Sequence, residues 1–185
     1  MELIIKVSQS RLLAQKVAIN LLNSKLVSFT KGIDAVVEVA HQIIYEDLRN
    51  EEMLEKRVDE ISEELKNEDE YEYRFVDEKE LKIMIKKRLA PEYDFIISFE
   101  ERFSSLAFDI LQELLDKDLI RFRVNRVRVK TIIFESFEKF LKDREKASDR
   151  AHEILRERGI EEGEKYNEEY RKLHEQELRK LIGVS

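Results

Sequence analysis

The sequence has no cysteine, one proline and four glycines among 185 residues. Without cysteine there is no disulfide, no thiolate metal site and no cysteine nucleophile. So few prolines and glycines leave little material for turns, which favours long helices.

The usual catalytic motifs are missing as well. No G-x-x-x-x-G-K-[ST] or G-x-G-x-x-G loop occurs, so the common phosphate-binding loops are absent. The two threonines are Thr30 and Thr131, and no serine lies in the glycine context of a nucleophile elbow. Carboxylates are so abundant that they indicate solvated helix faces and mark no acid–base pair. We therefore expect no catalytic residue, no cofactor-binding residue and no enzyme.

Nothing in the sequence indicates a membrane protein. No apolar run approaches the roughly 18 residues that span a bilayer. The start, Met1 to Val7, lacks the basic region and the apolar stretch of a signal peptide. We expect a soluble cytoplasmic protein. Its richness in Lys and Glu resembles the composition of hyperthermophile proteins.

The chain resembles itself at an offset of 93 residues. Residues 21–29 fall on 114–122, and the matching pairs cluster at apolar positions with helical spacing. The sequence thus predicts an internal duplication, with repeat 1 at 1–93 and repeat 2 at 94–185.

Each repeat predicts two core helices and a helical arm. The best-matched segments, about 8–48 and 101–141, carry apolar stripes of helical period. Two such pairs, related by a pseudo-twofold axis, predict an all-α, antiparallel four-helix bundle. The tails, about 49–90 and 142–182, predict two projecting helical hairpins.

Charge supports the first hairpin. Residues 49–74 hold eleven acids and five bases, whereas residues 79–88 hold five bases and one acid. An antiparallel arrangement brings these runs together, and a ladder of weak ion pairs fixes their register.

Several local features refine this picture. Ser8 is a candidate N-cap, and Ser98 with Glu101 has capping-box spacing. Asp77 with Glu80 is a further capping pattern, for a helix that stops before Pro91. We expect Leu22 and Leu115 in the bundle core. The hairpin seams are predicted to contain Leu54, Val58, Ile61, Leu65, Leu81, Met84, Ile85 and Leu89 in the first, and Tyr166, Tyr170, Leu173, Leu178 and Leu181 in the second.

Three short segments stay ambiguous. Residues 121–130 alternate like a strand, but the repeat predicts a helix there, with a short strand as the alternative. The apolar runs 3–7 and 95–99 are either extended and adjacent or simply pack against the helix starts.

A family resemblance rests on these features. Two consecutive units share a Leu-Leu-x-x-x-Leu-[Val/Ile]-x-Phe turn, an aliphatic second helix ending in Leu and an acidic stretch. A basic helix end, Lys86-Lys87-Arg88-Leu89, closes the first unit. Over essentially its whole length the chain resembles the bacterial domain of unknown function family 507. The resemblance implies an all-helical fold and assigns no activity and no functional residue.

The three histidines suggest structure more than metal binding. His41 takes the place of Phe134 in the repeat, which predicts a partly buried structural role. His152 and His174 are expected to approach each other across the second hairpin. Neither has a histidine partner four residues away, so we expect no metal site.

The candidate partner-binding residues form two groups. The first is a run of five bases without an acid in ten residues, Arg121, Arg123, Arg126, Arg128 and Lys130. These bases suit phosphates or the acidic face of a partner. Alternatively, nearby acids of the same chain neutralise them: Asp116, Asp118, Glu135, Glu138 and the acidic arm. The second group is Tyr71 and Tyr73 at the tip of the first arm, which either anchor a partner or fold back onto the arm.

The sequence thus favours an interaction or scaffold module that binds a partner, another protein, between its two arms. One alternative is a nucleic-acid-associated protein that uses 121–130. The other is a small-molecule-binding protein with its site in the inter-arm cleft.

Overall fold

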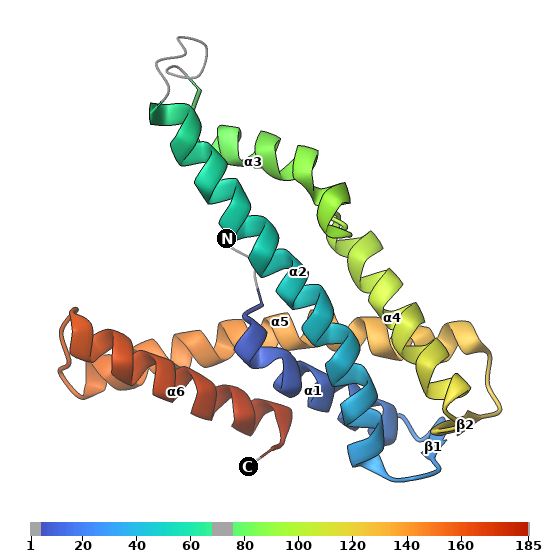
Figure 1. Cartoon of the computed structure of the whole chain (residues 1–185). Coiled ribbons are helices and arrows are strands. Elements are labelled where there is room, and N and C mark those ends of the chain that lie inside the picture. Colours follow the sequence, from blue (N-terminus) through green and yellow to red (C-terminus); the bar gives the residue numbers. More distant parts are fainter. Residues whose placement is uncertain (1–4, 68–75, 185) are drawn as a thin grey trace.

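The computed structural model describes residues 5–67 and 76–184, and helices dominate it (Figure 1). The first half contains α1 (Ser10–Asn23), β1 (Val27–Phe29), α2 (Ile33–Asn67) and α3 (Glu78–Leu89). The second half contains α4 (Phe99–Asp116), β2 (Ile120–Phe122), α5 (Arg126–Glu157) and α6 (Glu164–Ile182). Two 3₁₀ turns, η1 (Val7–Gln9) and η2 (Ala90–Tyr93), precede α1 and α4. The all-α prediction is confirmed.

The main hydrophobic core lies among four helices. α1 packs against α2 and α5, and α4 packs against α5 and α2. Their apolar positions recur every three to four residues, so each helix presents one continuous stripe to this core. The largest side chains buried there are Leu13, Leu21, Ile44, Leu48, Ile110, Leu111, Leu114, Ile120, Ile133, Phe137 and Phe140.

Two helical hairpins extend from this core and diverge (Figure 1). The first hairpin, within 49–90, packs α3 on the outer half of α2 around its own cluster, which includes Leu54, Val58, Leu81 and Ile85. The second hairpin, within 142–182, packs α6 on α5. Its separate cluster contains Ala151, Leu155 and Leu173, whereas Leu178 and Ile182 belong to the main core.

Four expected side-chain positions are wrong or only partly right. Leu22 is 48% exposed and Leu115 is half-buried, because the main core takes their neighbours Leu21 and Leu114 instead. Successive helical residues differ by about 100° in direction, so the neighbour of a buried residue can lie at the edge of the buried stripe or outside it. For the same reason Met84 and Leu181 are exposed, and Ile85 and Ile182 are buried in their place.

Of the predicted helix starts, one is confirmed in detail. The Ser98 side chain caps α4 by accepting a hydrogen bond from the Glu101 backbone N–H, at 3.5 Å. Asp77 is the N-cap residue of α3 but makes no side-chain capping bond. Ser8 does not cap a helix, because η1 delays the start of α1 to Ser10.

The ambiguous segment 121–130 divides into two structures. β2 pairs antiparallel with β1, with Val27 opposite Phe122 and Phe29 opposite Ile120. The chain then turns at Asn125, whose side chain accepts from the Val127 N–H at 2.8 Å, and α5 begins. The strand alternative therefore applies to 120–122 and the helix prediction applies from 126 onward. The described parts of the runs 3–7 and 95–99 contain no strand.

Element boundaries recur at the offset of 93. α1 ends at Asn23 and α4 at Asp116, and β1 coincides with β2. α2 begins at Ile33 and α5 at Arg126. The two strand–loop–helix corners, 27–37 and 120–130, therefore share the same order of strand, loop and helix, although φ of the residue before the helix is +83° at Gly32 and −61° at Asn125. Further along, the helix ends no longer coincide.

Candidate interaction surface at the basic end

The paired strands and the starts of α2 and α5 meet at one end of the molecule, at the lower right of Figure 1. We call residues 24–32 and 117–131 the basic end. They hold eight bases and one acid, a formal net charge of +7, whereas the whole chain carries −7. Charge is therefore strongly segregated along the molecule.

Strand alternation turns the first arginines of the run outward. Ile120 is buried and Phe122 is half-buried against the main core, so Arg121 between them is exposed. Arg123 follows with the same orientation and is also exposed. The apolar positions thus hold the strand in place and leave the bases free to face solvent.

The remaining bases lie on the first turns of α5. Arg126 donates a hydrogen bond to Gln112 Oε1 on α4, at 2.8 Å. Arg128 is exposed and Lys130 is half-buried. The first turn of α5 contains no acid, although the helix dipole favours acids there and disfavours bases. The charges of these bases therefore do not stabilise α5 through its helix dipole.

Internal neutralisation accounts for little of this charge. Arg121 and Asp118 lie 3.4 Å apart, with side chains that are 70% and 72% exposed. Such an exposed pair contributes only about 0.2–1 kcal/mol. Within the described residues, the side chains of Arg123, Arg128 and Lys130 make no hydrogen bond or ion pair. Asp116 accepts from Gln112 at 2.7 Å and pairs with none of the five bases.

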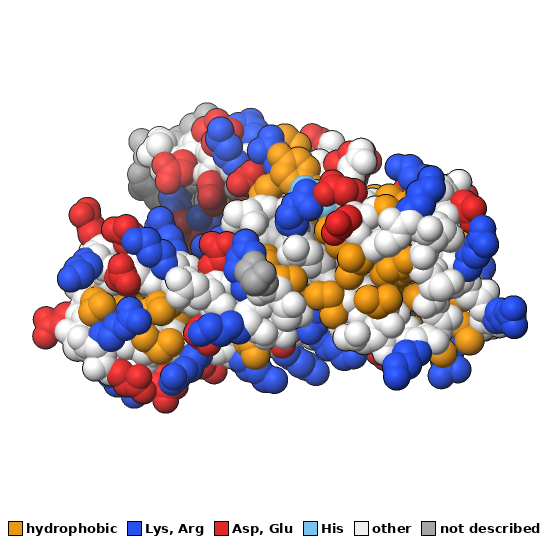
Figure 2. All heavy atoms as spheres, turned by 90° about the horizontal axis from the view of Figure 1, so that it is seen from below, with side chains coloured by type: hydrophobic (Ala, Val, Ile, Leu, Met, Phe, Trp, Pro, Cys, Tyr) orange, Lys and Arg blue, Asp and Glu red, His pale blue; other side chains and the backbone are white. Residues whose placement is uncertain are grey.

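A hollow of about 1060 Å³ lies across this corner. Its charged lining is entirely basic, and the rest is mainly aliphatic. Figure 2 shows Lys and Arg predominating over acids at the right-hand end of the molecule, beside an apolar patch. The lining residues are Lys25, Leu26, Val27, Ser28, Leu115, Ile120, Arg121, Phe122, Arg123, Val124 and Arg126.

The acidic arm is not beside these bases. At 1.5 Å per residue, the 35 residues of α2 span about 50 Å from the basic end to the outer end of the first hairpin. Tyr71 and Tyr73, the other predicted partner-binding residues, lie outside the described part of the chain. The structure therefore brings together the five bases of 121–130 and does not join them to the acidic arm.

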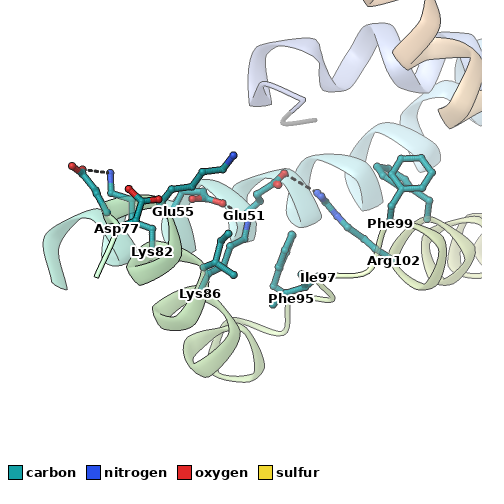
Figure 3. A pocket seen from close by; sticks show the side chains of 13 residues that line it. Glu51, Glu55, Asp77, Lys82, Lys86, Phe95, Ile97, Phe99 and Arg102 are labelled. Atoms are coloured by element: carbon teal, nitrogen blue, oxygen red, sulfur yellow. Dashed lines mark hydrogen bonds and ion pairs between the residues drawn. The ribbon is translucent and has the colours of Figure 1, made fainter. Parts of the chain in front are cut away.

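A second hollow, of about 620 Å³, lies among α2, α3 and α4 (Figure 3). At its centre the Phe95 ring lies between two cations, with Lys86 Nζ 5.4 Å and Arg102 Cζ 4.5 Å from its centroid. Lys86 pairs with Glu55. Lys82, on the rim, lies 2.9 Å from Asp59.

Arg102 is the centre of a buried ion network that the sequence analysis missed. Its guanidinium lies 2.5 Å from Asp47 and 2.9 Å from Glu51, and the side chain is almost fully buried. The available signal was Asp47, a carboxylate within the apolar stripe of α2. Because Lys82, Lys86 and Arg102 are all paired internally, we assign this hollow a structural role at the root of the first hairpin.

The histidines also have protein partners. His41 Nε2 lies 3.1 Å from Ser10 Oγ, and burial, followed by the charge of Arg11, lowers the pKa of His41. His152 and His174 stack on Tyr170, with centroids 4.7 and 5.7 Å away. Burial lowers the pKa of His174, whose Nε2 donates to the Arg144 carbonyl at 3.2 Å. Residues 5–67 and 76–184 contain no group of three or more His, Asp or Glu side chains that could hold a metal ion.

Comparison with known proteins identifies a family but no activity. The family model described as "Protein of unknown function (DUF507)" matches residues 3–181. No curated protein matches the chain. None of the helices in the described segments is long and apolar enough to cross a membrane.

Proposed function

The chain belongs to the DUF507 family, and we propose that it is an interaction module whose basic end binds an acidic partner. In this proposal the two halves are copies of one unit. The helices α1, α2, α4 and α5 form an antiparallel four-helix bundle, and the hairpins are its two arms. The bundle presents the basic end as its binding surface.

One observation carries the proposal: the two corners share a structure but not a charge. At the offset of 93, each of the five bases aligns with a neutral residue of the first half. The aligned pairs are Ser28 and Arg121, Thr30 and Arg123, Ile33 and Arg126, Ala35 and Arg128, and Val37 and Lys130. The first corner forms the same strand, loop and helix start without these bases. The fold therefore does not require them.

Keeping these bases together has an energetic cost. Two like charges about 7 Å apart repel by roughly 0.5 kcal/mol in water. Bases on the first turn of a helix add an unfavourable interaction of a few tenths of a kcal/mol with the helix dipole. The carboxylates of an acidic partner offset both the repulsion between the bases and their unfavourable interaction with the helix dipole. This supports binding as the reason why the bases are clustered.

The binding surface proposed here is at the basic end, whereas the sequence favoured a partner bound between the two arms. The second hollow takes its lining from α2, α3, α4 and the segment that joins α3 to α4, and thus includes only the first arm. Its central cations already have carboxylate partners. Unpaired charge and hollow surface coincide instead at the basic end, which is therefore the better-supported binding surface.

The experiment measures binding of poly-L-glutamate to the full chain. The test variant is Arg123→Thr with Arg128→Ala, which installs the residues of the first corner. The matched control is Lys165→Thr with Arg171→Ala. It removes two exposed bases of α6 that make no ion pair within the described part of the chain. We expect the test variant to bind about tenfold more weakly and the control to bind like the original chain. Equal effects of both variants would contradict the proposal.

A further inference from the structure

Exposed apolar side chains lie next to the basic cluster. Val127 is 67% exposed and Phe108 is 50% exposed, although both lie on well-packed helices. Burial of apolar surface contributes about 25 cal/mol per Å², so each is an unused source of binding free energy. A single exposed apolar residue is ordinary, and the position of these two relative to the bases is what gives them meaning.

A hydrogen bond joins the two helix segments that carry these side chains. Arg126 directly precedes Val127 on α5 and donates to Gln112 of α4. Gln112 lies one helical turn after Phe108. The Arg126–Gln112 link therefore brings the start of α5, which carries the bases and Val127, against the part of α4 that carries Phe108. Two carboxylates of α4 lie close to this link: Asp109, next to Phe108, and Asp116, which accepts from Gln112 at 2.7 Å.

We propose that the acidic partner is an amphipathic protein helix, an inference that rests on the proposed function. Its carboxylates pair with Arg121, Arg123 and Arg128, and its apolar stripe covers Val127 and Phe108. Helices bind grooves in this way through apolar anchors spaced three and four residues apart. The +7 charge of the basic end supplies the complementarity that selects an acidic helix over a basic or neutral one.

The lining of the large hollow favours protein over nucleic acid. Single-stranded nucleic acid binds on aromatic side chains, on which successive bases stack. Here the lining contains one aromatic residue, Phe122, and it is half-buried. The other apolar lining residues are aliphatic: Leu26, Val27, Leu115, Ile120 and Val124. Aliphatic surface suits the Leu and Ile side chains of a helix.

Three probes test the inference on the full chain. The first is a 15-residue peptide of Glu and Leu with Leu at i, i+3, i+4 and i+7. The second has the same composition, with Leu distributed around the helix. The third is a 15-nucleotide oligouridine. The test variant is Val127→Ser with Phe108→Ser. The control variant is Met53→Ser with Met84→Ser, which changes two exposed apolar residues of the first hairpin.

We expect the original chain to bind the amphipathic peptide about tenfold more tightly than either other probe. Val127→Ser with Phe108→Ser removes that preference and leaves the weaker binding of the redistributed peptide unchanged. The methionine control keeps the preference.

The outcomes separate the two proposals. Equal affinity for both peptides, or an unchanged preference in the Val127 and Phe108 variant, overturns the amphipathic helix. The same holds if oligouridine binds most tightly. In each of these cases the acidic-partner proposal survives if Arg123→Thr with Arg128→Ala still weakens binding. If that variant binds all three probes normally, both proposals are wrong.

Discussion

The two strand–loop–helix corners have the same order of elements but differ in surface charge. Both contain a three-residue strand followed by a helix that starts four residues later. Both bury a valine at the same place, Val36 in the first corner and Val129 in the second. At the five positions aligned with the basic run, the first corner has neutral residues and the second has bases. The comparison teaches that the buried positions set this local fold, whereas the exposed positions are free to acquire a binding role.

We expect the largest difference in stability between the two halves at the position that Arg102 occupies in the second half. Arg102 of α4 aligns with Gln9 of the first half, and both are buried. Arg102→Ala leaves Asp47 and Glu51 buried without their cation, which should cost about 3–5 kcal/mol. Gln9→Ala removes one neutral hydrogen bond to the Lys6 N–H and should cost about 1–3 kcal/mol.

Urea unfolding of the two variants measures this difference. Arg102→Met, which retains apolar packing against Phe95 but no charge, serves as the control. We expect its free energy of unfolding to exceed that of Arg102→Ala by at most about 2 kcal/mol. Equal losses for Arg102→Ala and Gln9→Ala would show that the buried ion network adds nothing to the root of the first hairpin.

A smaller difference concerns pH. His174 of the second hairpin aligns with Leu81 of the first, and burial lowers the pKa of His174. A folded-state pKa below the unfolded value means that the folded state favours neutral histidine. His174 therefore destabilises the fold as pH falls below its unfolded pKa of about 6.5. His174→Leu should flatten the fall in unfolding free energy between pH 7 and pH 5.

Unfolding at both pH values, with His152→Leu for comparison, checks this prediction. An unchanged slope in His174→Leu would show that the histidine titrates alike in the folded and unfolded chains.

Sequence reasoning was most accurate where the two halves agree. The shared apolar stripes predicted α2 and α5, and the position of the turns followed from their common Leu and Phe positions. It was less accurate where one residue decides the outcome. To tell whether Leu21 or Leu22 is buried, one must know how α1 is rotated about its axis relative to its neighbours, and helix packing determines that rotation.

The candidate site was predicted in composition but not in arrangement. The five bases stand out as a run in the sequence. Whether the acids of the first arm neutralise them depends on where distant segments lie, and α2 is long enough to place those acids far from the basic end. The Arg102 network joins residues about fifty positions apart, and no local sequence pattern predicts such a contact. The sequence did not distinguish exposed Val127 from buried Val129. In a strand two residues that are two positions apart lie on the same face, whereas in a helix they point in different directions.

The account depends most on the claim that the bases of the second corner serve binding and not folding. The direct measurement is the free energy of unfolding of the triple variant Arg121→Ser, Arg123→Thr and Arg128→Ala, which copies the first corner. We predict a value within about 1 kcal/mol of the original chain, because one exposed ion pair is lost while repulsion is relieved. A loss of more than about 2 kcal/mol would show that these arginines hold the corner together, and would contradict the account.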